Sequence, residues 1–284
     1  MNGMQTAEFD GTGRKVSVIG VGTWSLEGSR SENVRSIRYA LDHGVNFIDT
    51  AEMYGTEDIV GEAIKGYRRE DLFIATKVWP THFAYHDVLK SCEESLKKLG
   101  TDYVDLYQLH WPNPSVSIKE TMSAMEKLVD EGRIRYIGIS NFSVKEMKEA
   151  MSALAKYRIV SNQLEYNVAT REIEDEGIYD FCRKNGMAII AYSPLSHGKI
   201  FGNEMILETL TDIGKKYGKR PAQVALNWII RKGAFPIPKA SKPIHMAENI
   251  ESTDFTLSDE DMKTLDSLYQ RHPIRSIASR YKGH

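Results

Sequence analysis

An alternation of short apolar runs with longer helical patterns constrains the fold of this chain more than any other feature. Apolar runs of about four to eight residues, bounded by turn residues, are typical of buried strands. We expect eight such strands, over Gly20–Trp24, Val45–Asp49, Leu72–Lys77, Val104–His110, Ile134–Ser140, Val160–Glu165, Ala188–Tyr192 and Phe235–Pro238.

Between the runs, apolar residues recur at helical spacing. This spacing predicts helices over Glu32–His43, Glu57–Ile64, His86–Leu99, Ile118–Asp130, Val144–Leu154, Glu172–Lys184 and Pro221–Arg231. Strands that each lead into a helix, within 284 residues, favour an α/β fold of the closed (β/α)8 TIM barrel type. An open doubly wound sheet is the alternative.

Both ends of the chain depart from this alternation. Residues 1–19 predict a β-hairpin with a glycine-containing turn, which we expect to cap the bottom of the barrel. An extra helix is expected over about Glu204–Tyr217, before the last strand, and another near the C-terminus, where Ser258 begins a capping box like that of Ser143. We interpret residues 1–284 as a single domain, with 269–284 as a basic tail.

Composition and charge exclude several classes of protein. A net charge of -2 gives no reason to expect binding to nucleic acid or to an anionic membrane. No apolar stretch approaches the roughly 20 residues of a membrane span, and no signal peptide is apparent. The two cysteines fit no disulfide framework, and His82 and His86 have no third metal ligand nearby, so we expect a cytoplasmic protein without a metal.

Four polar residues lie at or just beyond the ends of apolar runs, and they are the candidates for catalysis. Asp49, Lys77 and His110 close three successive runs about 30 residues apart, which is the length of one β/α unit, and Tyr54 follows shortly after Asp49. The carboxyl ends of barrel strands meet at one mouth, where catalytic residues of this fold lie. We therefore expect the four side chains to converge there.

This combination suits proton donation to a carbonyl oxygen. A free tyrosine has a pKa of about 10, and a nearby ammonium favours the phenolate. We expect Lys77 to lower the pKa of Tyr54, Asp49 to hold Lys77, and His110 to orient the substrate oxygen. Taken singly, each residue has a structural interpretation, as a cap, a surface aromatic, a solvated lysine or a buried histidine.

At these residues the chain resembles the aldo-keto reductases, from the hairpin to about Leu268. The motifs that carry the resemblance are Gly-Val-Asn-Phe-Ile-Asp49-Thr-Ala-Glu-Met-Tyr54-Gly, Lys77-Val-Trp79, Leu-His110-Trp111-Pro, Gly138-Ile-Ser140-Asn141-Phe, Asn162-Gln163-Leu-Glu-Tyr, Ala191-Tyr192-Ser193-Pro-Leu195 and Ile237-Pro-Lys239. The resemblance implies NADPH-dependent reduction of a carbonyl compound, with Asp49, Tyr54, Lys77 and His110 as the catalytic tetrad.

The resemblance also implies the cofactor site. Gly20-Val-Gly22 lacks the third glycine of a Rossmann fingerprint, and in this family the nucleotide lies across the barrel mouth. The positions that match the family's nicotinamide contacts are Ser140, Asn141, Gln163 and Tyr192. Ser193 and Leu195 match cofactor positions in the loop after the Tyr192 strand. The positions that match the phosphate and adenine contacts are Lys239, Ser241, Lys242, His245, Glu248 and Asn249. Independently, Pro243 starts a helix beside two lysines, which is a natural anion site.

One departure from the family bears on the choice of cofactor. His245 stands where many members have an arginine, and a neutral imidazole cannot form a bidentate charged contact with phosphate. We expect a preference for NADPH with measurable use of NADH.

The substrate pocket is expected to have aromatic walls, since Trp24, Trp79 and Trp111 match the substrate-facing positions of the family. Short loops favour small aldehydes, α-dicarbonyls and keto sugars over larger substrates. Two other functions remain open: a Schiff-base lyase at Lys77, and a nicotinamide-binding regulatory subunit with little turnover. The chain is expected to be a monomer, with an oligomer as the alternative.

Overall fold

The computed structural model describes residues 3–269 of the chain. Within them, eight parallel strands form one sheet in the order of the sequence. These strands are β3 (Val21–Gly22), β4 (Phe47–Asp49), β5 (Phe73–Val78), β6 (Val104–Leu109), β7 (Ile134–Ser140), β8 (Ile159–Glu165), β9 (Ala188–Tyr192) and β10 (Phe235–Pro236). All eight predicted strands are confirmed, although β3, β4 and β10 are shorter than expected.

Backbone hydrogen bonds between the first and last parallel strands close the sheet into a barrel. The Gly20 N–H donates to the Pro236 carbonyl over 2.9 Å, and the Gly22 N–H donates to the Pro238 carbonyl over 3.1 Å. A Cβ at Gly22 would lie 2.4 Å from the Ile237 carbonyl oxygen, so only glycine allows this approach. The (β/α)8 barrel is therefore confirmed.

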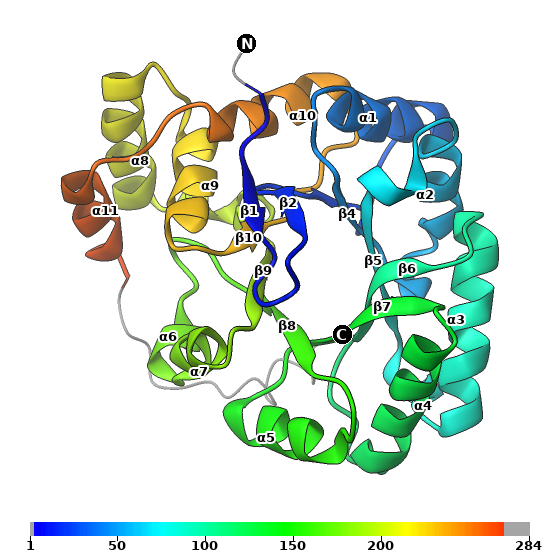
Figure 1. Ribbon diagram of the computed structural model, residues 1–284. Helices are drawn as coiled ribbons and strands as arrows, with labels where there is room; N and C mark the ends of the chain where they lie inside the picture. Colours follow the sequence, from blue (N-terminus) through cyan, green and yellow to red (C-terminus); the bar gives the residue numbers. More distant parts are fainter. Residues whose placement is uncertain (1–2, 270–284) are drawn as a thin grey trace.

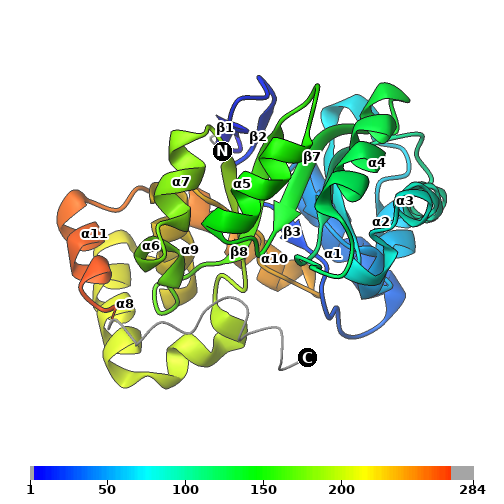
Figure 2. The same cartoon turned by 90° about the horizontal axis from the view of Figure 1, so that it is seen from below.

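Helices surround the strands, as Figures 1 and 2 show from two directions. The predicted helices are present, as are the extra helix before β10 and the one near the C-terminus. They are α1 (Arg30–Asp42), α2 (Glu57–Ala63), α3 (Tyr85–Leu99), α4 (Ile118–Asp130), α5 (Val144–Ala153), α6 (Glu172–Asp175), α7 (Ile178–Lys184), α8 (Glu204–Tyr217), α9 (Pro221–Arg231), α10 (Pro243–Ile250) and α11 (Asp259–Asp266). None of the helices within residues 3–269 is long and apolar enough to cross a membrane.

Two details of the helices differ from expectation. The helix predicted over Glu172–Lys184 is interrupted at Gly177, whose φ of 69° lies in the left-handed region and separates α6 from α7. Ser258 caps α11 by accepting a hydrogen bond from the Asp261 N–H, but its own N–H donates to the Tyr217 hydroxyl instead of to Asp261. The Ser143 box is complete on both sides.

The N-terminal hairpin closes one end of the barrel, as predicted. Strands β1 (Thr6–Glu8) and β2 (Lys15–Ser17) pair antiparallel and lie across the bottom of the barrel (Figure 1). Phe9, next to β1, is fully buried, and its ring centroid lies 4.8 Å from that of Phe73 and 5.3 Å from that of Phe235. Burying a side chain of this size stabilises the fold by about 2–3 kcal/mol.

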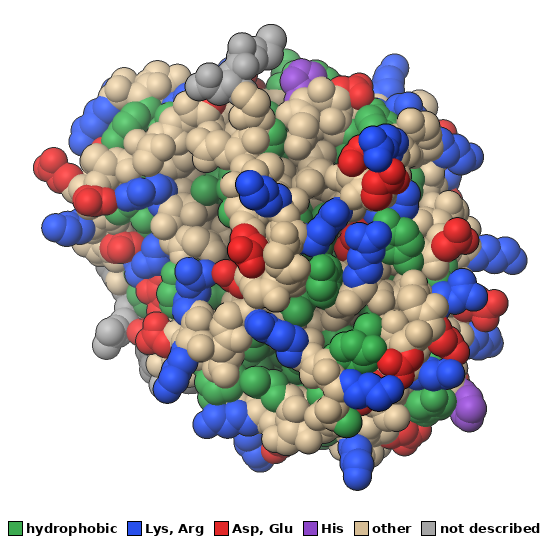
Figure 3. All heavy atoms as spheres, viewed as in Figure 1, with side chains coloured by type: hydrophobic (Ala, Val, Ile, Leu, Met, Phe, Trp, Pro, Cys, Tyr) green, Lys and Arg blue, Asp and Glu red, His purple; other side chains and the backbone are tan. Residues whose placement is uncertain are grey.

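The face seen in Figure 3, which carries the hairpin, has basic and acidic side chains interspersed over it. Such a surface creates no strong field of one sign. Cys92 and Cys182 are both buried and free. The predicted basic tail, from residue 270 onward, lies outside the described residues.

Candidate active site

The four residues predicted to act in catalysis come together at the carboxyl end of the barrel. Asp49 ends β4, Lys77 lies near the end of β5, and His110 follows β6 directly. Tyr54 ends the short 3-10 helix η1 (Glu52–Tyr54) that follows β4. The parallel register of the strands therefore places all four at one mouth, as their spacing predicts.

Lys77 is the hub of this cluster. It is completely buried, and its Nζ donates to Asp49 Oδ1 over 2.5 Å, to the Thr50 carbonyl over 2.8 Å and to the Tyr54 hydroxyl over 3.2 Å. An ammonium has three N–H donors, and these three acceptors use them all. The Tyr54 hydroxyl also lies 3.4 Å from His110 Nε2, so a continuous polar chain runs from Asp49 to His110.

The second oxygen of Asp49 is held by two amides. Gln163 Nε2 donates to Asp49 Oδ2 over 2.8 Å, and Gln108 Nε2 donates to it over 3.2 Å. Gln108, in β6, is fully buried and is not among the residues predicted for the site. Gly138 on β7 makes room for it, since a Cβ there would lie 2.8 Å from Gln108 Cγ. Asp49 is thus a fully hydrogen-bonded buried carboxylate.

The electrostatics of Tyr54 differ from the prediction. Burial of the phenol, together with the negative charge of Asp49, raises the pKa of Tyr54 well above its usual value. The expected lowering of the Tyr54 pKa by Lys77 is therefore wrong, because burial of the phenol and the charge of Asp49 prevail over the ammonium, which lies nearer to Asp49 than to Tyr54. Burial also lowers the pKa of Lys77, and the Asp49 carboxylate opposes that shift.

His110 is neutral over the physiological pH range. Its burial, with the positive charge of Lys77 as a smaller cause, lowers the pKa of His110 to about 2. Its Nδ1 is buried and has no hydrogen-bond partner among the described residues. The imidazole therefore serves as an uncharged hydrogen-bonding group beside Tyr54.

A second polar group lies beside the tetrad on β7, β8 and β9. The Ser140 hydroxyl donates to the Gln163 carbonyl over 3.0 Å. The Asn141 amide donates to the His110 carbonyl over 3.2 Å, and its oxygen accepts from the Tyr192 hydroxyl over 2.9 Å. The four residues predicted for the nicotinamide are therefore neighbours, and their amides and hydroxyls suit recognition of a carboxamide.

The residues predicted for the rest of the cofactor lie farther around the mouth. In the loop after β9, Ser193 and Leu195 are half-buried, and the Ser193 hydroxyl lies 3.1 Å from His197 Nε2. After β10, Lys239 Nζ forms an ion pair with Glu27 Oε1 over 2.7 Å, and the Ser241 hydroxyl accepts a hydrogen bond from the Glu27 N–H.

The start of α10 has the predicted form. Pro243 is its first residue and Lys242 its N-cap. His245 and Glu248 lie one turn apart and pair over 3.4 Å, Glu248 also pairs with Arg220, and Asn249 is buried.

The three predicted pocket tryptophans have different surroundings. Trp79 packs edge-on against His110, with ring centroids 5.1 Å apart. Trp24 is 48% exposed and lies 5.2 Å from the His197 ring, between centroids. Trp111 is half-buried and packs against the hydrophobic core.

Backbone strain is concentrated at the same end of the barrel. Within residues 3–269, five residues other than glycine have positive φ, and all follow carboxyl ends of strands: Ser25, Asn141, Ser193, Ser196 and His197. A left-handed non-glycine residue costs about 1–3 kcal/mol, and such residues cluster at functional sites.

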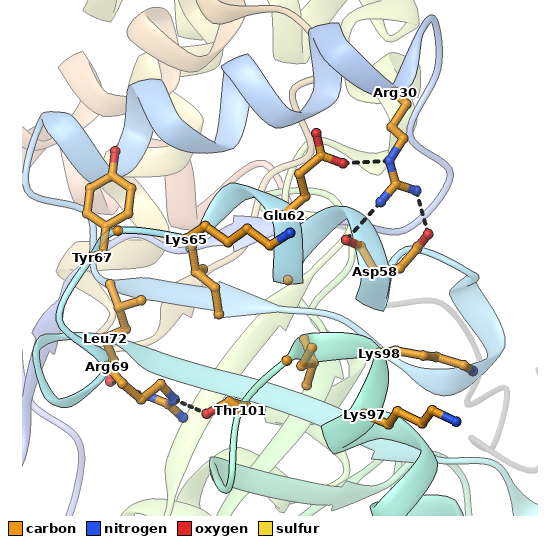
Figure 4. Close-up of a pocket in the computed structure, with 15 residues that line it drawn as sticks. Arg30, Asp58, Glu62, Lys65, Tyr67, Arg69, Leu72, Lys97, Lys98 and Thr101 are labelled. Carbon is orange, nitrogen blue, oxygen red and sulfur yellow. Dashed lines mark hydrogen bonds and ion pairs between the residues drawn. The ribbon is translucent and has the colours of Figure 1, made fainter.

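A separate groove of about 500 Å³ lies away from this mouth, between α2 and α3. Figure 4 shows Arg30 at its edge, bonded to Asp58 and Glu62. The groove contains none of the residues predicted for catalysis. No group of three or more metal-ligating side chains occurs in the described part of the chain.

Comparison with known proteins places this barrel and its mouth in a family. A sequence model described as "Aldo/keto reductase family" matches residues 18–270. The chain is 38% identical over 252 residues to a glyoxal reductase of Bacillus subtilis, covering 88% of both chains, and 36% identical over 257 residues to a methylglyoxal reductase of Yersinia pestis, covering 89% of this chain and 93% of the other.

Solved structures agree with this placement. The thermostable aldo-keto reductase Tm1743, in complex with the inhibitor epalrestat, superposes with a TM-score of 0.89 at 44% identity, covering 93% of this chain and 100% of the other. An aldo-keto reductase from Klebsiella pneumoniae in complex with NADPH gives a TM-score of 0.85 at 36% identity, covering 94% and 95%. The chain belongs to the aldo/keto reductase family.

Proposed function

We propose that this chain reduces small aldehydes and α-dicarbonyl compounds to alcohols, with NADPH as the hydride donor and Tyr54 as the proton donor. The observation that carries the proposal is the chain of contacts from Asp49 through Lys77 to the Tyr54 hydroxyl, beside a neutral His110. NADPH, when bound, supplies the hydride that reaches the carbonyl carbon.

Tyr54 supplies the proton that the oxygen needs. A substrate oxygen becomes alkoxide-like as hydride arrives at the carbon, and this developing negative charge makes the oxygen an acceptor for the Tyr54 proton. The Lys77 N–H that contacts the Tyr54 hydroxyl stabilises the phenolate left behind. Asp49 keeps Lys77 in place, and neutral His110 can donate or accept a hydrogen bond at the same oxygen.

We infer that the cofactor spans the mouth from Tyr192 to α10. Ser140, Asn141 and Gln163 would hold the carboxamide, and Tyr192 would stack on the ring. Ser193 and Leu195 would lie along the dinucleotide, and the phosphate and adenine groups would meet the residues around the start of α10: Lys239, Ser241, Lys242, His245, Glu248 and Asn249. Lys242 at the N-cap of a helix supports the phosphate assignment, because free N–H groups and a cation attract anions.

The substrate class follows from the size of the mouth and from the relatives. Only residues 110–117 separate β6 from α4, so little chain is available there to enclose a large substrate. Trp79 beside His110 would supply an apolar wall at the reacting group. The glyoxal and methylglyoxal reductases among the relatives act on small α-dicarbonyls by name. Keto sugars remain the second substrate class.

The geometry disfavours a Schiff-base lyase at Lys77. A lysine nucleophile needs a free amine, whereas all three donors of Lys77 are engaged and Asp49 lies 2.5 Å away. We further infer a monomeric enzyme, since a closed barrel needs no partner chain to complete its core, and a cytoplasmic one, since both cysteines are unpaired.

The test is the loss of reduced-nicotinamide absorbance with purified protein over a panel of glyoxal, methylglyoxal, simple aldehydes and keto sugars. We expect turnover with the α-dicarbonyls to have the highest kcat/KM, and NADPH to be preferred over NADH. Absence of turnover over the whole panel, with borohydride-dependent trapping of a carbonyl compound on Lys77, would replace the reductase with the lyase.

A further inference from the structure

Glu27 forms an ion pair with Lys239, the lysine predicted to contact the cofactor phosphate. Glu27 belongs to the loop of residues 23–29 between β3 and α1, and its Oε1 lies 2.7 Å from Lys239 Nζ. The same ammonium donates to the Ser25 carbonyl over 3.0 Å. The backbone N–H of Glu27 donates to the Ser241 hydroxyl over 2.9 Å. One loop thus contacts both Lys239 and Ser241.

The contact changes the charge available to a phosphate. The hydrogen bond from Lys239 lowers the pKa of Glu27, so the carboxylate is ionised at neutral pH. It compensates the charge of Lys239, and His245 is already paired with Glu248. Lys242, the N-cap of α10, forms no salt bridge within residues 3–269, although its charge acts on the exposed carboxylate of Glu32.

We propose that Glu27 is a selectivity residue that competes with the 2′-phosphate of NADPH for Lys239, and so narrows the preference for NADPH over NADH. This inference rests on the proposed cofactor site. NADH has no 2′-phosphate, so the competition affects only the binding of NADPH. His245, which cannot form the bidentate charged contact of an arginine, also reduces the preference for NADPH, so Glu27 and His245 act in the same direction.

The ion pair between Glu27 and Lys239 is weak enough to reduce NADPH binding without preventing it. The Lys239 side chain is 35% exposed and that of Glu27 is 78% exposed. Exposed ion pairs are weak and are screened by salt. A phosphate that carries nearly two negative charges can therefore displace the single carboxylate, but it binds less tightly than it would to an uncompensated lysine.

The variant Glu27→Gln isolates the charge. It keeps the length of the side chain. The hydrogen bonds from Lys239 Nζ to the Ser25 carbonyl and from the Glu27 N–H to the Ser241 hydroxyl do not depend on the carboxylate. Glu94→Gln is the matched control, because Glu94 is an exposed member of a Lys90 pair on α3, away from the mouth. Both variants change the net charge by one unit.

The experiment measures dissociation constants of NADPH and NADH by quenching of tryptophan fluorescence, without substrate, at low salt and at 0.5 M salt. Glu27→Gln removes the repulsion between the single negative charge of the carboxylate and the nearly two negative charges of the 2′-phosphate, which lie several ångströms apart in solvent. We therefore expect this variant to bind NADPH about three- to tenfold more tightly at low salt. Binding of NADH should change by less than about twofold, and the gain for NADPH should shrink at high salt. Glu94→Gln should change neither constant.

Equal tightening for both dinucleotides, or no change for NADPH, would overturn the inference while leaving the proposed function intact. Weaker binding of NADPH by Glu27→Gln would also overturn it, and would make Glu27 a structural support of the site. Failure of the wild-type protein to bind either dinucleotide would overturn the proposed function and this inference with it.

Discussion

Removal of Lys77 is the perturbation whose consequence the structure fixes most sharply. Lys77 and Asp49 are 0% and 1% exposed, and their charged atoms lie 2.5 Å apart. In Lys77→Met, a side chain of similar length leaves Asp49 buried without its counter-charge. Breaking a buried ion pair by deleting one partner costs about 3–5 kcal/mol. The Gln108 and Gln163 amides still donate to Asp49 Oδ2, so we expect the lower end, about 3 kcal/mol.

Asp49→Asn and the double variant complete a double-mutant cycle with Lys77→Met, and their stabilities follow from the same contacts. Asp49→Asn should cost less, about 1–2 kcal/mol, because burial already lowers the pKa of Lys77 and the amine can lose its proton. The double variant removes both charges, and replacement of a whole buried pair by neutral groups is often nearly neutral. We therefore expect it to be more stable than Lys77→Met alone.

Urea unfolding of the four proteins, followed by circular dichroism, measures this cycle. The coupling energy between the two positions should be about 2–3 kcal/mol, larger than the cost of Asp49→Asn, so that the double variant is more stable than Lys77→Met. A loss below about 1 kcal/mol in Lys77→Met, or losses that simply add in the double variant, would refute the description of the pair as a mutually compensating buried unit.

Two further predictions concern His110 and the closure of the barrel. Because the pKa of His110 is depressed in the folded protein, only the unfolded chain protonates this residue between about pH 6.5 and pH 2. The free energy of unfolding therefore falls as the pH falls, by about 2 kcal/mol from pH 7 to pH 5. Urea unfolding at both pH values should show a smaller loss in His110→Gln, and an equal loss would contradict the shift. Gly22→Ala should lower stability by about 1–3 kcal/mol, because its Cβ would meet the Ile237 carbonyl. Gly202→Ala, with open space around it, should change stability by less than about 0.5 kcal/mol; thermal melts that do not separate these two variants would contradict the closure argument.

Much of the fold could be predicted because its signals are local. Strands and helices of a barrel repeat with a period that apolar runs reveal, and Ile134–Ser140 and Ile118–Asp130 have the predicted bounds. The break at Gly177 was missed because a glycine is tolerated within many helices, and only the chain around it decides whether it adopts positive φ. Ser258 was assigned the wrong partner because Tyr217, which accepts its N–H, is remote in sequence.

The site was predicted where polar residues interrupt or end apolar runs, which identified Asp49, Lys77 and His110. Gln108 lies on β6 two positions before His110, so side-chain alternation along the strand directs both side chains to the same side, and this spacing is a sequence signal for Gln108. The direction of the Tyr54 pKa shift could not be predicted, because it depends on how deeply the fold buries the phenol and on the nearby charge of Asp49. The contact of Glu27 with Lys239 joins loops more than 200 residues apart and has no sequence signal.

Turnover of Tyr54→Phe with NADPH and methylglyoxal tests the central claim most directly, together with NADPH affinity and thermal stability. Tyr157→Phe is the matched control, since Tyr157 is an exposed tyrosine whose hydroxyl bonds Asp130. If Tyr54 is the proton donor, kcat falls by about 10²- to 10⁴-fold in Tyr54→Phe, while NADPH affinity and the melting temperature stay near those of the wild type. A kcat within about tenfold of the wild type, with NADPH still bound, would contradict the account.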